Sequence, residues 1–284
     1  MPRILIFNGA PIEGQRLMAS IPHAADNEGL FTDALSMFEA DLDVFRLDVA
    51  DGETLPQGHA ISDFDGVVIT GSPLNVYKDE PAVRGQIELA RQIYEAGIPS
   101  FGSCWGLQLM CAAVGGSVHL NPRGREVGVA RNIRLTDAGR EHALYRDKAS
   151  AFDAICSHED EVARLPAGAR LLASNDVSEV QAAEISDGAR SFWGVQYHPE
   201  FTFGTIAALL EKRAGRHVEE GLARSTAEID AVAADFRALH LDPSRRDIAW
   251  RHGLTAQVLD PMLRRIEFRN WLQTCVQPRV ASRA

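Results

Sequence analysis

Short apolar runs alternate with amphipathic stretches over the first 116 residues. Runs at 3–7, 42–47, 65–70 and 98–101 have the length and composition of strands. Between them, apolar residues at helical spacing predict helices near Gly29–Ala40, over Val83–Tyr94 and from Trp105 to Val114. Strands alternating with helices predict an α/β fold, with a mostly parallel central sheet flanked by helices.

The pattern changes after Gly116. Six short runs are typical of strands, and a hairpin is expected across Asp187-Gly188. The expected strands are 118–120, 127–135, 152–156, 171–174, 180–185 and 191–197.

Helical signals return in the last 80 residues. Ser225 and Glu228 fit a capping box, and Asp260-Pro261 fits a helix start. We expect a core domain at 1–202 and a helical C-terminal extension at 203–284, packed on the core or on a partner subunit in a homo-oligomer. Residues 213–258 are interpreted as an inserted helical segment that packs on the core or on a second subunit, with a lid over the site as the alternative.

The composition and charge of the chain argue against several classes of function. The net charge of −10 argues against non-specific binding to nucleic acid. The chain starts directly in a strand and has no apolar run of membrane-spanning length, so no membrane partner is expected. Four cysteines without C-x-x-C spacing predict neither a metal site nor a disulfide framework, which favours the reducing cytoplasm.

One cysteine stands at the junction of an expected strand and helix. Gly102 and Gly106 flank Cys104 as G-x-C-x-G, the thiol version of a nucleophile elbow. A helix N-terminus beneath the thiol would favour the thiolate. The alternative is an inert buried cysteine, because most cysteines are small core residues.

The last expected strand ends in Gly194-Val-Gln-Tyr-His198-Pro-Glu200. On extended backbone His198 and Glu200 point the same way, so the carboxylate could hold one ring nitrogen while the other faces a thiol. An ordinary strand-end turn is the alternative. A zinc deaminase is excluded because no P-C-x-x-C follows.

Three separated motifs together resemble a known family. They are T-G-S-P from Thr70, G-x-C-x-G-x-Q from Gly102, and G-V-Q-Y-H-P-E from Gly194. Over residues 3–202 the chain resembles the class I (triad) glutamine amidotransferases, which have a flavodoxin-like fold. It is most similar to the glutaminase part of GMP synthetase and to stand-alone γ-glutamyl hydrolases.

The resemblance implies roles for particular residues. Cys104 would attack a γ-glutamyl amide, His198 would carry the proton to the leaving amine, and Glu200 would orient His198. The product is a thioester that water hydrolyses, and no cofactor is implied. Backbone N–H groups of Trp105 and of the turn at Gly71 and Ser72 would form the oxyanion hole. The implied substrate-binding residues are Gln108, Ser157, His158, Glu159 and Asp160.

Three positions depart from the usual pattern of the family. Ser72 replaces a glycine, which would be strained if its φ were positive. Glu159 also replaces a glycine, and would contact a substrate ammonium or stay solvated. Trp105 is bulky; packing is the favoured interpretation over narrowing the site or stacking on an aromatic leaving group.

Two classes of function remain open. The first is hydrolysis of a γ-glutamyl amide, either of glutamine or of a γ-glutamyl amine or peptide. Within it, the protein could act alone or supply ammonia to a separate synthase partner. The second is a non-catalytic binding module on the same fold.

Overall fold

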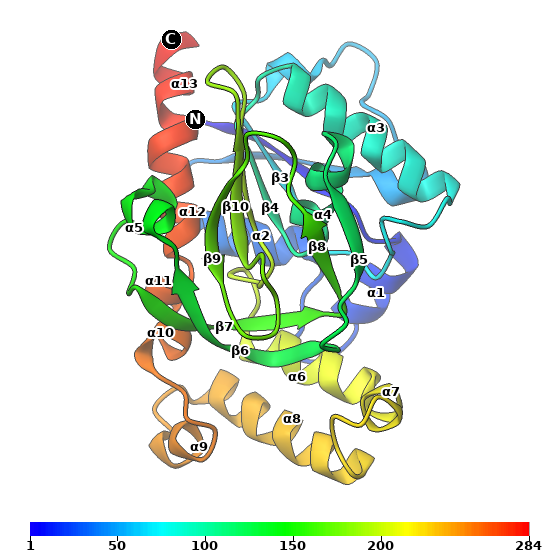
Figure 1. Cartoon of the computed structure of the whole chain (residues 1–284), viewed down its shortest axis with the longest axis vertical. Coiled ribbons are helices and arrows are strands. Elements are labelled where there is room, and N and C mark those ends of the chain that lie inside the picture. Colours follow the sequence, from blue (N-terminus) through cyan, green and yellow to red (C-terminus); the bar gives the residue numbers. More distant parts are fainter. Residues whose placement is uncertain (284) are drawn as a thin grey trace.

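A nine-stranded mixed sheet forms the centre of the computed structural model, which describes residues 1–283 (Figure 1). Its order is β2-β1-β3-β4-β11-β10-β9-β6-β7, and β5 pairs with β8 in a second, two-stranded sheet. The strands are β1 (Arg3–Asn8), β2 (Asp43–Asp48), β3 (Gly66–Ile69), β4 (Ser100–Ser103), β5 (Ser117–Leu120), β6 (Glu126–Leu135), β7 (Ala151–His158), β8 (Asp160–Arg164), β9 (Arg170–Ser174), β10 (Ala182–Ser186) and β11 (Ser191–Val195).

Thirteen α-helical segments are described. They are α1 (Ile12–Ala19), α2 (Asn27–Ser36), α3 (Pro81–Glu95), α4 (Trp105–Ala113), α5 (Asp137–Glu141), α6 (Phe203–Lys212), α7 (Ala214–Glu219), α8 (Thr226–Leu241), α9 (Arg246–Arg251), α10 (Ala256–Leu259), α11 (Pro261–Arg264), α12 (Ile266–Trp271) and α13 (Gln277–Arg283). A π-helical turn, Leu272–Val276, joins α12 to α13. No helix within residues 1–283 is both long enough and apolar enough to cross a membrane.

The two faces of the sheet are covered by different helices. From β2 to β11 all neighbouring strands are parallel, and from β11 to β7 all are antiparallel. Alternate residues of β1 point to opposite faces. Ile4 and Ile6 pack with α2 and α12, while Leu5 and Phe7 pack with α3 and α4. The expectation of an α/β fold with a parallel sheet between helices is confirmed, and antiparallel strands extend that sheet.

Several local expectations are confirmed and others are not. The hairpin at Asp187-Gly188 joins antiparallel β10 and β11, and the Asp260 side chain caps α11 with Pro261 at its first position. Both α1 and β8 were missed. The strand β8 begins in a charged segment and is fixed by pairing with β5, which local sequence does not reveal. Near the C-terminus, α11 ends at Arg264 and α12 begins at Ile266.

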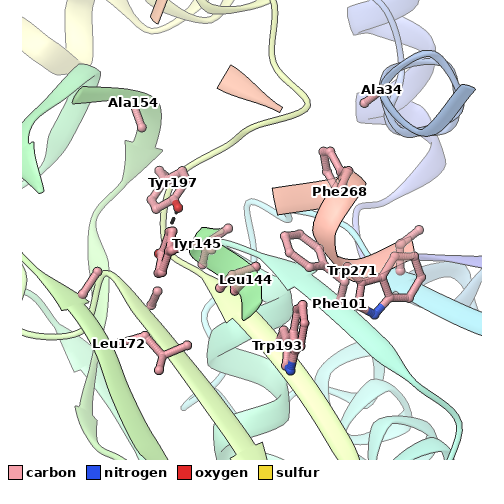
Figure 2. Close-up of a cluster of buried hydrophobic side chains, with 14 of the residues drawn as sticks. Ala34, Phe101, Leu144, Tyr145, Ala154, Leu172, Trp193, Tyr197, Phe268 and Trp271 are labelled. Carbon is pink, nitrogen blue, oxygen red and sulfur yellow. Dashed lines mark hydrogen bonds between the residues drawn. The ribbon is translucent and has the colours of Figure 1, made fainter. Parts of the chain in front are cut away.

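The C-terminal helices join two hydrophobic clusters. Phe268 and Trp271 of α12 lie in the main core against Phe101, with ring centroids 4.9 and 6.2 Å away (Figure 2). Helices α6, α8 and α9 instead form a cluster that includes Phe236 of α8 and Ile155 of β7, beyond one end of the sheet (Figure 1). The domain boundary at residue 202 stays a prediction.

A buried ion pair ties α12 to the rest of the protein. Lys148 Nζ donates to Glu267 Oε1 at 2.6 Å, and the two side chains are 2% and 0% exposed. Tyr197 Oη donates to the same oxygen at 2.6 Å and lies 3.0 Å from Tyr145 Oη (Figure 2). Burial lowers the pKa of Lys148, against the attraction of Glu267. Each charge therefore depends on the other.

Glu267→Gln should lower the free energy of unfolding by about 3 kcal/mol, because it leaves the Lys148 charge buried without a counter-ion. Urea denaturation followed by circular dichroism measures this. Adding Lys148→Met should recover most of the loss, since no buried charge then remains. Glu88→Gln, in the exposed pair with Arg91, is the control and should change stability by less than about 1 kcal/mol. A small change in unfolding free energy for Glu267→Gln alone would show that this ion pair does not hold α12 to the rest of the protein.

Candidate active site

The turn between β4 and α4 places a cysteine above the sheet. Cys104 caps α4 with φ 52° and ψ −102°, a conformation that is costly for a non-glycine residue. The flanking glycines allow the helix to approach the strands closely. A Cβ on Gly106 would lie 2.5 Å from the Ile69 carbonyl oxygen, and one on Gly102 would lie 2.7 Å from the Gly106 carbonyl carbon. The G-x-C-x-G spacing thus serves steric needs on both sides of the cysteine.

A histidine and a glutamate follow β11, the strand next to β4. His198 Nδ1 lies 2.7 Å from Glu200 Oε1, and both side chains are almost fully buried. Ser103 Oγ donates to the same Glu200 oxygen at 2.9 Å. The imidazole stacks on Phe201, with ring centroids 3.8 Å apart. Carboxylate and stacking partner together fix the ring and leave Nε2 free of the glutamate.

The electrostatics of this pair favour the charged histidine. Burial lowers the pKa of His198, but the charge of Glu200, with hydrogen bonds to Glu200 and to the Cys104 sulfur, outweighs it and raises the pKa to about 10. Cys104 Sγ itself lies 3.8 Å from the Ser157 carbonyl oxygen. The imidazolium and the N-terminus of α4 therefore both place positive charge at the position of this cysteine.

The turn after β3 forms another wall of the site. A Cβ on Gly71 would lie 2.9 Å from His198 Cε1, so only glycine leaves room for the ring. Asn27 Nδ2 donates to the Gly71 carbonyl at 3.1 Å and so helps to hold the turn. Ser72 is not strained, since the non-glycine residues with positive φ within 1–283 are His23, Cys104, Asn132 and Asp147.

These groups line one pocket of about 180 Å³. Its walls come from α1, α2, the turn after β3, the elbow, the β7–β8 segment, and α6 with α7. Among the lining residues are Pro11, Gln15, Asn27, Gly71, Ser72, Asn75, Cys104, Gln108, Arg125, Ser157, His158, Glu159, Asp160, His198, Thr205, Leu209, Lys212, Arg213 and Arg216. Within residues 1–283 no group of three or more His, Cys, Asp or Glu side chains is arranged to hold a metal ion.

The backbone of Trp105, the expected oxyanion donor, lies at the site, whereas its side chain lies in the hydrophobic core. It is the first residue of α4, where N–H groups lack an acceptor within the helix. Its indole is 1% exposed, donates to Gln86 Oε1 at 2.8 Å and lies in the core on the α3–α4 face. The packing interpretation is therefore confirmed, and stacking on a leaving group is excluded.

Two of the expected substrate residues have polar partners inside the protein. Gln108 Nε2 donates to the Asp160 carbonyl at 3.0 Å and to Gln196 Oε1 at 3.2 Å. The Asp160 carboxylate accepts from Asn75 Nδ2 at 2.7 Å and Tyr77 Oη at 3.1 Å, and burial raises its pKa. Asn75 and Tyr77 were not singled out from the sequence, because neither lies in a recognisable motif.

The side chains of His158 and Glu159 both have polar partners within the protein. The His158 imidazole is 3% exposed and contacts Glu126 Oε2 at 3.0 Å and the Asp160 carbonyl at 3.1 Å, so it braces the segment. Glu159 forms ion pairs with Arg125 and Arg216, and it is therefore not simply solvated.

A comparison with models of known protein families shows the family of this chain. The family model described as glutamine amidotransferase class-I matches residues 25–214, about two thirds of the chain. The protein belongs to that family.

Particular relatives refine the picture. A γ-glutamyl-L-1-hydroxyisopropylamide hydrolase from Pseudomonas sp. is 35% identical over 230 residues, covering 79% of this chain and 76% of the relative. GMP synthase (glutamine-hydrolysing) from Methylobacillus flagellatus is 37% identical over 142 residues, covering 48% of this chain and 25% of the synthase. A glutamine amidotransferase structure from Thermotoga maritima shares the fold, with a TM-score of 0.68 at 19% identity, covering 97% of this chain and 98% of that one.

Glu200→Gln should lower the pKa of His198 below its ordinary value, because burial then acts with no carboxylate to oppose it. Nuclear magnetic resonance titration of labelled histidine measures this. Since the wild-type pKa is raised to about 10, the stabilising contribution is complete below about pH 6.5 and is lost as the pH rises through 10. The variant should thus lose most stability near pH 6 and little above pH 10. An unchanged histidine pKa would contradict this account.

Proposed function

We propose that this protein hydrolyses a γ-glutamyl amide bond, releasing glutamate and ammonia or an amine. The observation that carries the proposal is that Cys104 and His198 line one pocket and that Glu200 holds His198 from behind it. Cys104 stands on a strained elbow, and the buried pair of His198 and Glu200 lies beside it. A thiol paired with a base, and the base held by a third group, is the arrangement of nucleophilic catalysis.

The first half of the reaction forms a thioester. The Cys104 thiolate attacks the γ-carbonyl carbon, and the His198 imidazolium gives its proton to the leaving nitrogen as the C–N bond breaks. Glu200 acts as a positioning residue that orients the ring and offsets its charge. The raised pKa of His198 supports a protonated imidazole that can act as the acid in this half-reaction.

The second half regenerates the enzyme. Water loses a proton to the neutral His198 and attacks the thioester, and the sulfur leaves as the thiolate with glutamate as product. In both halves the tetrahedral oxyanion would accept hydrogen bonds from the N–H groups of Trp105 and of the Gly71-Ser72 turn. One such donor is worth about 2.7–4 kcal/mol in a water-excluded site.

Self-sufficient hydrolysis of a γ-glutamyl conjugate is the favoured version. The similarity to the Pseudomonas hydrolase extends over three quarters of both chains, whereas the matched part of the GMP synthases is about a quarter of their length. The resemblance to that amidotransferase part nevertheless keeps a second version open, in which ammonia passes to a separate synthase. We expect either version to operate in the cytoplasm.

Turnover of glutamine, γ-glutamyl dipeptides and γ-glutamyl alkylamides should fall at least about 10³-fold in Cys104→Ala, because the nucleophile is lost. Release of glutamate measures it. Fast turnover of one conjugate over glutamine supports the self-sufficient version. Slow glutamine hydrolysis alone supports a synthase partner. Absence of turnover by the wild-type protein on every member would contradict the proposal and favour the binding module.

Gly71→Ala should lower kcat/KM by about 10²-fold, because the added methyl displaces the His198 ring from its aligned position. Gly85→Ala is the matched control. It lies on the exposed side of α3, where a Cβ meets nothing within 4 Å, and should leave turnover unchanged. Circular dichroism confirms that both variants fold. Full activity in Gly71→Ala would show that the turn does not constrain the histidine.

A further inference from the structure

One side of α6 and α7 forms a wall of the pocket. The lining positions recur at helical spacing, so their side chains share a face. They are Thr205, Leu209, Lys212, Arg213 and Arg216. These residues follow the histidine and glutamate in the chain, and none of them was expected from the sequence to line the site.

Two arginines on this side of the pocket are already neutralised. Arg125, with 4% of its side chain exposed, pairs with Glu159 and with Glu220, the latter at 2.6 Å. Arg216 pairs with the same two glutamates, at 2.8 Å to Glu220. Two positive and two negative charges therefore form a closed, balanced network.

Arg213 stands outside that network. Within residues 1–283, no carboxylate oxygen lies within 4.0 Å of its guanidinium nitrogens, the distance that defines an ion pair. Its polar contact is a hydrogen bond from Nη1 to Ser157 Oγ at 3.4 Å. Burial, with repulsion from Arg125 and Arg216, lowers its pKa. A partly buried guanidinium without a counter-ion is costly unless a ligand supplies an anion.

Its position relates it directly to the nucleophile. The same Ser157 that contacts Arg213 presents its carbonyl 3.8 Å from Cys104 Sγ. A γ-glutamyl substrate carries carboxylates only a few bonds from the carbon that Cys104 attacks. The α-carboxyl carbon is four bonds from the carbon that Cys104 attacks, and the carboxyl carbon of a leaving amino acid is three bonds away.

We propose that Arg213 binds a carboxylate of the γ-glutamyl substrate and thereby selects for it. This rests on the proposed function. The carboxylate belongs either to the glutamyl half or to the leaving amine, and a planar guanidinium can hold either by two parallel hydrogen bonds.

The test compares four substrates in Arg213→Gln, Arg213→Lys and the wild-type protein. They are glutamine, γ-glutamylethylamide, γ-glutamylglycine, and glutamine α-amide, which lacks the α-carboxylate. Arg224→Gln is the control, since that side chain is 92% exposed and lies outside the pocket lining. We expect Arg213→Gln to lower kcat/KM about 30-fold or more on the affected substrates, mainly through KM, with partial recovery in Arg213→Lys.

Two patterns support the proposal and distinguish the source. Loss on every substrate except glutamine α-amide assigns the α-carboxylate of the glutamyl half. Loss confined to γ-glutamylglycine assigns a carboxylate on the leaving amine. An unchanged kcat/KM on all four substrates overturns the proposal. So does an equal loss on all four, which would mean that Arg213 acts on the thiolate or on the fold.

A second measurement is independent of turnover. Iodoacetate and iodoacetamide alkylate thiolates and differ in one negative charge, so their rate ratio at Cys104 reports attraction of an anion. We expect Arg213→Gln to lower this ratio at least fivefold, measured on the Cys104 peptide by mass spectrometry. If the wild-type protein turns over no substrate, the proposed function fails, and the ratio alone decides whether Arg213 attracts a carboxylate. An unchanged ratio then overturns the inference.

Discussion

The hydrogen-bonded register of two neighbouring strands is the constraint on which the site depends. Ser103 pairs with Val195, and the Cys104 N–H donates to the Val195 carbonyl at 2.7 Å. A shift of one residue would turn every side chain of β11 to the other face. The register thus brings the cysteine beside His198, and Ser103 Oγ fastens the same strand end to Glu200. Two segments distant in sequence become one chemical unit.

Much of this could be predicted from the sequence because its signals are local. Apolar runs and helical spacing give the parallel half of the sheet and its covering helices. The spacing of Gly102, Cys104 and Gly106 indicates an elbow, and the pair His198 and Glu200 indicates an oriented imidazole. The family resemblance rests on these motifs, and the match over residues 25–214 confirms it.

The remaining features depend on tertiary contacts that no local pattern encodes. Strand β8 is charged at its start and is stabilised by β5, while α1 buries only Gln15 and Met18 and lies beside the pocket. Arg125 and Arg216 meet Glu159 and Glu220 only after β6, β7 and α7 come together. Arg213 takes no part in this network of ion pairs, and the sequence alone does not show which arginines are paired.

The hydrogen bonds that support the segment around the histidine come from residues that are synthesised late. Glu267 accepts the Tyr197 hydroxyl one residue from His198, and Arg265 Nη2 donates to the Glu200 carbonyl at 3.3 Å. A nascent chain that has emerged only to residue 260 carries the cysteine, histidine and glutamate but none of this support. The segment that carries the histidine and the glutamate therefore gains these two hydrogen bonds only when residues 265 and 267 have been made.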